Sequence, residues 1–138
     1  MQSASNYRSG RHCVFALHVH LVFTPKYRRH VFLPVHLDCL REVFSGVATE
    51  FDAALVEFNG ESDHVHLLLH YPPQVELSRL INSLKGVSSR KLRRQHPDIQ
   101  RHYWGNSTLW SRSYFAASCG GASLEVLHDY IAGQRVPT

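Results

Sequence analysis

Two kinds of hydrophobic periodicity alternate along this 138-residue chain, and their order restricts the folds that it can adopt. Runs rich in β-branched and aromatic residues predict strands, and apolar residues three or four positions apart predict helices. In chain order these patterns predict a strand at 14–23, a helix at 34–51, strands at 54–58 and 63–69, a helix at 77–95, a strand at 111–118 and a helix at 122–134. This order predicts an α/β (α+β) fold of the ferredoxin-like, RRM-like split βαβ type, with an antiparallel sheet, helices on one face and an added C-terminal helix.

The length of the chain suits one compact domain with its own core, and we expect residues 1–138 to form that single domain. Residues 1–10 are expected to be flexible, and Asn59-Gly60 predicts the turn of a hairpin. The apolar runs are shorter than the roughly 18 to 20 residues of a membrane span, and Met1 to Arg11 lacks the apolar core of a signal peptide. We therefore expect a soluble cytoplasmic protein.

Two histidines lie two residues apart in the predicted strand Asp63-His64-Val65-His66-Leu67-Leu68-Leu69. Side chains two apart in a strand share a face, so His64 and His66 can offer a metal ion two ligands. Such pairs also occur on ordinary strands, so this one is weak evidence alone. Asp63 can orient a ligand imidazole, although as a strand neighbour of His64 it is predicted to face away. His18 and His20 form a second such pair, to which we assign a structural or DNA-adjacent role.

The last predicted helix carries a phenol and an amide on one face. Ser123 is a plausible N-cap, and the apolar stripe of this segment has helical spacing. Tyr130 and Gln134 are then four residues apart on the same face, where the phenol can sit beside an amide oxygen that completes the metal site. Two imidazoles with one amide oxygen suit Mg²⁺ or Mn²⁺ as the divalent metal.

Charge is segregated along the chain, whose formal net charge is +4. Between 77 and 124 there are eight Lys and Arg residues against one acid, Asp98, and a second acid-free basic stretch runs from Arg8 to Arg29. Eight of the eleven acids lie between Asp38 and Glu76. One such cluster fits a solvated surface equally well, but two clusters flanking a candidate metal site favour a nucleic acid partner.

Six blocks in order along nearly the whole chain resemble the single-tyrosine transposases of the HUH nuclease superfamily, which small bacterial and archaeal insertion sequences carry. The blocks are His20-Leu21-Val22-Phe23-Thr24-Pro25-Lys26-Tyr27-Arg28-Arg29, Asp63-His64-Val65-His66-Leu67-Leu68, Leu84-Lys85-Gly86-Val87-Ser88-Ser89, Tyr103-Trp104-Gly105, Leu109-Trp110-Ser111-Arg112-Ser113-Tyr114-Phe115 and Tyr130 to Gln134. The resemblance implies a transposase that cleaves and rejoins single-stranded DNA at hairpin-bearing element ends.

The resemblance also implies roles for individual residues. His64, His66 and Gln134 become the metal ligands and Tyr130 the nucleophile, while Gly133 stands where the family often has Asn. The partners implied are single-stranded DNA hairpins and a second copy of the chain, in a homodimer where the tyrosine helix can act in trans. Our candidates for DNA contact are Lys26, Tyr27, Arg28, Arg29, Lys85, Arg90, Arg93, Arg94 and Arg112.

Tyrosine chemistry explains why such an enzyme needs a metal. Phenol attack on the scissile phosphate keeps the bond energy as a 5′-phosphotyrosine ester, which a 3′-hydroxyl can later reverse. An unperturbed phenol has a pKa near 10 and is a poor nucleophile at neutral pH. A cation on the phosphate would withdraw charge and stabilise the leaving oxygen.

Three other functions stay open at the level of the sequence. A domesticated relative would process chromosomal repeats by the same chemistry. A non-catalytic nucleic-acid-binding module of ferredoxin-like fold would bind DNA without a covalent adduct. A metal-dependent hydrolase of small phosphoesters would need no basic helix and would leave no protein–DNA link.

Overall fold

The computed structural model describes residues 8–9, 14–102 and 108–118. Its elements are β1 (Arg8–Ser9), β2 (Val14–Phe15), β3 (Leu17–Phe23), the short 3-10 helix η2 (Lys26–Arg28), α1 (Pro34–Glu50), β4 (Ala54–Glu61), β5 (His64–Tyr71), α2 (Leu77–Gln95), the 3-10 helix η3 (Pro97–His102) and β6 (Phe115–Ser118). The predicted helix at 122–134, with Tyr130 and Gln134, lies outside the described residues. Within the described part, no helix is both long and apolar enough to cross a bilayer.

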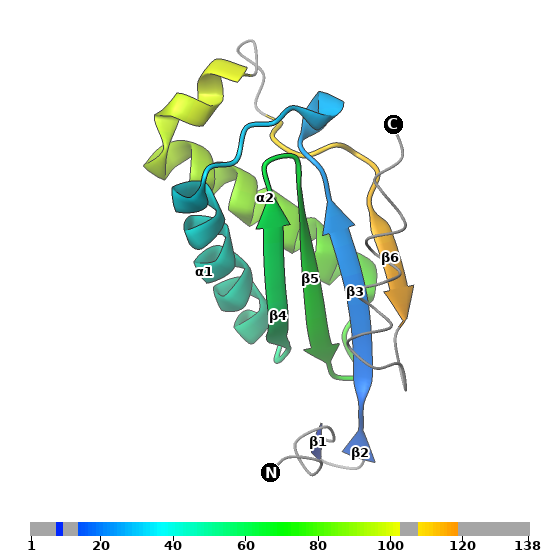
Figure 1. The fold of residues 1–138 in the computed structure, drawn as a ribbon. Coiled ribbons are helices and arrows are strands. Elements are labelled where there is room, and N and C mark those ends of the chain that lie inside the picture. The colour runs from blue at the N-terminus through cyan, green and yellow to red at the C-terminus, as the bar shows by residue number, and fades with distance from the viewer. Residues whose placement is uncertain (1–7, 10–13, 103–107, 119–138) are drawn as a thin grey trace.

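The main sheet has the strand order β4-β5-β3-β6, and every neighbouring pair is antiparallel. Helices α1 and α2 both cover one face of this sheet (Figure 1). Strand β3 lies between β5 and β6, so the two βαβ halves interleave as a ferredoxin-like fold requires. The predicted fold class is therefore confirmed.

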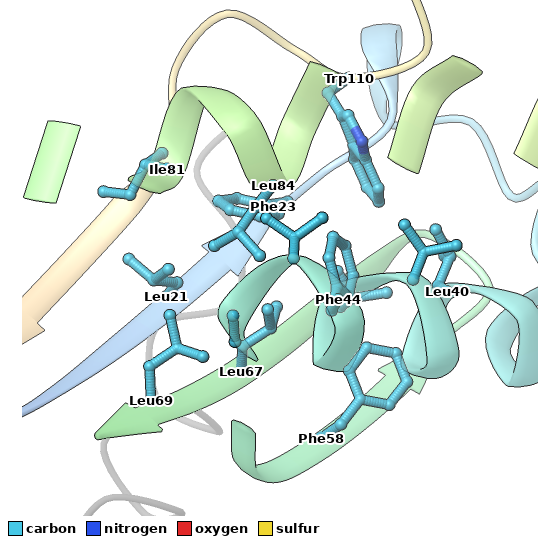
Figure 2. Close-up of a cluster of buried hydrophobic side chains, with 14 of the residues drawn as sticks. Leu21, Phe23, Leu40, Phe44, Phe58, Leu67, Leu69, Ile81, Leu84 and Trp110 are labelled. Atoms are coloured by element: carbon cyan, nitrogen blue, oxygen red, sulfur yellow. The ribbon is translucent and has the colours of Figure 1, made fainter. Parts of the chain in front are cut away.

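The core fills the space between the sheet and the two helices (Figure 2). Leu21 of β3 and Leu67 of β5 face each other in register and are fully buried. Phe23 packs against Phe44 of α1 and against Trp110, with ring centroids 5.9 Å and 5.6 Å apart. Because side chains alternate along a strand, the residues between these core positions point to the opposite face, which the two helices leave uncovered.

The predicted strand at 14–23 is broken at Ala16, which separates β2 from β3. Leu17 pairs with Tyr71, the last residue of β5, and Phe15 pairs instead with Arg8 of β1. The chain continues from Tyr71 into Pro72-Pro73, which has no backbone N–H to extend the ladder. The partner strand therefore ends there, and the small β1–β2 sheet was not predicted.

The hairpin turn lies at Ser62-Asp63 and not at Asn59-Gly60, so that prediction was wrong. Gly60 is inside β4 and pairs with Val65. A Cβ atom at position 60 would lie only 2.6 Å from Leu37 Cδ2 of α1. The glycine is there because the helix packs closely on the strand, a contact that a turn pattern does not reveal.

The last strand begins at Phe115, four residues later than predicted. The Lys85 ammonium of α2 accounts for part of this difference, because it donates to the carbonyls of Ser111 at 2.8 Å and Arg112 at 3.2 Å. These carbonyls point towards Lys85 and are not available to a neighbouring strand. Partial burial lowers the pKa of Lys85, because desolvation disfavours the charged form.

Candidate metal centre and DNA-binding surface

Histidines gather on the sheet face that the helices leave uncovered. His64 and His66 lie on this face of β5, with ring centroids 6.0 Å apart, because the intervening Val65 points into the core. His20 of the adjacent strand β3 stacks on His66 at 5.6 Å between centroids. The shared face predicted for His64 and His66 is what the structure shows.

Asp63 fixes the orientation of His64. Its Oδ1 accepts a hydrogen bond from His64 Nδ1 at 2.9 Å, and its Oδ2 pairs with Arg28 Nη2 at 3.1 Å. Burial raises the pKa of Asp63, but the hydrogen bonds from His64 and Arg28 outweigh it, so the net pKa is lowered and the carboxylate stays charged. The expectation that Asp63 faces away from His64 was wrong, because Asp63 lies in the turn before β5, where strand alternation does not apply.

The donor set fits a divalent cation. A carboxylate can only accept hydrogen bonds, so Asp63 places the His64 proton on Nδ1 and leaves the lone pair of Nε2 for a metal. His66 supplies a second imidazole on the same face. Gln134, the third predicted ligand, lies outside the described residues and stays a prediction.

Asp63→Asn is expected to weaken Mn²⁺ binding by about 10- to 100-fold, the usual effect of removing such a supporting acceptor. The neutral amide holds the His64 N–H less strongly and loses the ion pair with Arg28. Titration calorimetry with Mn²⁺ measures the change. Asp52→Asn, the same substitution at an exposed residue of the α1–β4 turn, is the matched control. Equal affinities for the two variants would contradict the orienting role.

The second histidine pair divides between two environments. His18 stacks on His70 with centroids 4.5 Å apart, and burial lowers the pKa of both rings, which favours their neutral forms. This stack lies towards the opposite end of β3 and β5 from His64. His20 instead lies against His66. The structural role expected of the pair therefore fits His18, whose ring packs on His70, whereas the DNA-adjacent role stays a prediction for His20.

One further group of potential ligands occurs within the described residues, formed by His36, His96 and Asp98. The Leu33 N–H donates to His36 Nδ1 at 3.0 Å, so the neutral ring carries its proton on Nε2 and donates it to Asp98 Oδ2 at 3.0 Å. Both nitrogens of His36 are thus engaged. The ring caps the start of α1 and ties it to η3, a structural task that leaves no lone pair for a metal.

The basic candidates for DNA contact do not form one surface. Lys26, Tyr27, Arg28 and Arg29 follow β3 at the end of the sheet where the β4–β5 hairpin and His64 lie (Figure 1). By contrast, Arg90, Arg93 and Arg94 belong to α2, in the layer behind the sheet. Arg112 is exposed, and the partly buried Lys85 donates to the backbone carbonyls of Ser111 and Arg112. The expectation that two clusters flank the metal site thus fits the Lys26–Arg29 cluster alone.

Sequence reasoning missed the internal link between Arg28 and Asp63, which are 35 positions apart. An acid directly before a His-x-His pair is a visible signal for an orienting group. No local pattern, however, indicates which distant cation pairs with that acid.

Solved structures with this architecture indicate the class of protein. A putative transposase from Deinococcus radiodurans superposes with a TM-score of 0.76 at 30% sequence identity, over 94% of this chain and 99% of that one. A REP-associated tyrosine transposase bound to a REP hairpin superposes with a TM-score of 0.60 at 12% identity, over 88% of this chain and 67% of that one, and this match supports the fold alone. The class is that of transposases with a ferredoxin-like fold.

The sequence comparisons identify the family. The family model described as transposase IS200 like matches residues 13–134. The ISDra2 transposase TnpA of Deinococcus radiodurans is 29% identical over 93% of this chain and 91% of its own length. A transposase for insertion sequence element IS200 from Salmonella typhimurium is 31% identical over 83% of this chain and 74% of its own length. The chain belongs to the IS200-like family of single-tyrosine transposases.

Proposed function

We propose that this transposase cleaves and rejoins single-stranded DNA at hairpin-bearing ends of an insertion sequence, with Tyr130 as nucleophile. His64, His66 and Gln134 would hold the divalent metal, Mg²⁺ or Mn²⁺. The observation that carries the proposal is the pair of imidazoles on the sheet face that α1 and α2 leave uncovered, one of them oriented by Asp63. That arrangement leaves a ring nitrogen available to a cation in a family of DNA-rearranging proteins.

The proposed cleavage exchanges one phosphate ester for another. The Tyr130 phenol gives up its proton to water, and its oxygen forms a bond to the scissile phosphorus while the bond from phosphorus to the 3′-oxygen breaks. The 3′-oxygen leaves with the bonding electron pair and takes up a proton from water. The DNA 5′-phosphate is then linked to Tyr130. A 3′-hydroxyl attacks this phosphorus and loses its proton to water, the bond to the Tyr130 oxygen breaks, and the phenol takes a proton back from water as the strand is rejoined. When bound, the metal supplies charge withdrawal from a non-bridging phosphate oxygen.

Two partners belong to this proposal. The first is single-stranded DNA folded as a hairpin, which a structural neighbour of the same fold also binds in the form of a REP hairpin. The second is another copy of the chain, in a homodimer whose tyrosine helices can be exchanged between subunits. Insertion-sequence transposases among the relatives favour a mobile element over a domesticated repeat-processing form.

The proposal is tested by incubating the protein with single-stranded element-end DNA and Mg²⁺ or Mn²⁺, followed by denaturing electrophoresis. We expect a slower band in which protein and DNA are covalently joined, and its loss on addition of a chelator. DNA binding with no such band would indicate a non-catalytic binding module. Cut DNA with no linked protein would indicate a hydrolase.

The proposed contribution of the α2 arginines Arg90, Arg93 and Arg94 to DNA affinity can be measured separately. Replacing Arg93 and Arg94 by Ala is expected to lower the affinity. The salt slope, which is the slope of the logarithm of the binding constant against the logarithm of the salt concentration, should become shallower by about 0.7 for each phosphate that the variant no longer neutralises. Fluorescence anisotropy across a series of salt concentrations gives both quantities. Lys91→Ala is the matched control, because Lys91 is on the same helix but lines a groove with the acids Asp38 and Glu42. An unchanged slope in the double variant would exclude this face from the DNA-binding surface.

A further inference from the structure

Tyr27 is presented to solvent by a strained turn. Its side chain is 72% exposed, the largest exposure among the large hydrophobic residues of the described chain. Tyr27 and the following Arg28 have φ angles of 64° and 52°, in the left-handed region that bulky side chains rarely adopt. Strain of this kind persists only where the surrounding structure imposes it, and it is concentrated at functional sites.

The surroundings of Tyr27 fix the turn on both sides. Pro25 bridges to Trp110, and the Lys26 N–H donates to the Leu109 carbonyl at 2.8 Å. On the other side, Arg28 is held by Asp63 at 3.1 Å. The turn is therefore tied to the rest of the fold on both sides, while Tyr27 itself stays exposed.

Two cations lie over the exposed ring of Tyr27, at cation–π distance. Lys26 Nζ is 5.5 Å and the Arg29 guanidinium carbon 5.3 Å from the centroid of Tyr27. An exposed aromatic ring with two cations over it provides the two elements by which proteins bind single-stranded nucleic acid, a ring on which a base can stack and cations that can move from the ring to the phosphates. An apolar protein partner would not need the cations, and a phosphate alone would not need the ring.

The position of the turn points to the same ligand. Arg28 joins Tyr27 to Asp63, and Asp63 holds His64, so the ring lies a short chain of contacts away from the candidate metal ligand. Figure 1 shows the turn, drawn in blue after β3, at the same end of the sheet as the β4–β5 hairpin. A nucleotide bound by the ring would belong to the strand that enters the cleavage site.

We propose that Tyr27 is a stacking platform for one unpaired nucleobase of the DNA, next to the metal-ligand pair, and that Arg28 is a positioning residue that anchors the platform to Asp63. This inference rests on the proposed function, in which single-stranded DNA is the substrate. The platform would set where along the strand the cleaved phosphate lies relative to the hairpin.

The affinity test compares two uncharged, apolar replacements of Tyr27, of which one keeps an aromatic ring and the other does not. Tyr27→Leu is expected to weaken binding of a hairpin with unpaired flanks by roughly tenfold, within the range of base–aromatic stacking, whereas Tyr27→Phe keeps the affinity. The salt slope stays unchanged in both, because no charge is removed, and it falls in Lys26→Ala. Equal affinity of Tyr27→Leu and the unmodified protein would overturn the proposal.

A second measurement detects the stacked base directly. 2-Aminopurine placed at successive unpaired positions is expected to be quenched at one position by the unmodified protein and by Tyr27→Phe, but not by Tyr27→Leu. Tyr27→Gly, which relieves the left-handed strain, is expected to lose the quenching without a fall in melting temperature, which separates a binding defect from a folding defect. Quenching that persists in Tyr27→Leu would overturn the assignment.

The covalent-adduct assay on the same samples distinguishes failure of the inference from failure of the proposed function. If Tyr27→Leu forms the covalent adduct and binds the hairpin DNA as tightly as the unmodified protein, the stacking role of Tyr27 is overturned and the proposed cleavage chemistry is left intact. Quenching that depends on Tyr27 in a protein that forms no adduct would support the platform and exclude the cleavage chemistry.

Discussion

Replacing Tyr130 by phenylalanine is expected to abolish the covalent protein–DNA product while DNA binding persists. The substitution removes one oxygen atom, the proposed nucleophile, and keeps the ring. Loss of a nucleophile lowers the rate of the chemical step by at least about a thousandfold, so the adduct band falls below detection on a denaturing gel. Anisotropy with the same hairpin DNA measures the retained affinity.

The control for Tyr130 is another phenol on the same chain. Tyr114 is exposed and lies beside Phe23 and Lys85, away from the imidazole pair. Tyr114→Phe is expected to form the adduct at the rate of the unmodified protein. If Tyr130→Phe still formed a band and Tyr114→Phe did not, the nucleophile would have been assigned to the wrong residue.

The second large effect is expected from His64→Ala, which should remove metal-dependent cleavage and weaken Mn²⁺ binding by more than the 10- to 100-fold expected of a supporting residue. The remaining imidazole of His66 cannot hold the cation with the same geometry. Adduct formation across a Mn²⁺ titration and calorimetry with the metal alone give independent readouts. The side chain of His64 is partly exposed, so we expect little change in the stability of the fold.

His18→Ala is the matched control for His64→Ala. Its ring is on the same sheet face but stacks on His70, towards the other end of the strands. Cleavage and metal affinity are expected to stay close to those of the unmodified protein. Metal-independent cutting by His64→Ala would contradict the ligand assignment.

Adduct formation in a mixture of His64→Ala and Tyr130→Phe would show that one subunit supplies the tyrosine and the other the imidazoles.

The fold could be predicted because the spacing of apolar residues in a sequence reflects which side chains are buried. The helix predicted at 34–51 is observed at Pro34–Glu50, and the one predicted at 77–95 is observed at Leu77–Gln95. Both helices have a long apolar stripe against the sheet, which is the signal that a sequence displays most directly. The order of the elements then left few topologies in which both stripes are buried on one face.

The details that failed depend on contacts between distant parts of the chain. The turn predicted at Asn59-Gly60 is wrong because Gly60 is required by the close approach of Leu37, a residue of another element. Likewise, strand alternation predicted the shared face of His64 and His66 but not the acceptor of the His64 proton, since Asp63 precedes the strand. The split of the basic residues between two layers also required the three-dimensional arrangement.

The internal engagement of two of these cations bears on how the charge of the chain is interpreted. Lys85 holds the carbonyls of Ser111 and Arg112, and Arg28 holds Asp63, so neither is free to neutralise a phosphate without giving up an interaction within the fold. Counterion release on DNA binding should therefore correspond to fewer phosphates than the number of basic candidates suggests. In this transposase, part of the formal positive charge stabilises contacts within the fold and is not available to the DNA.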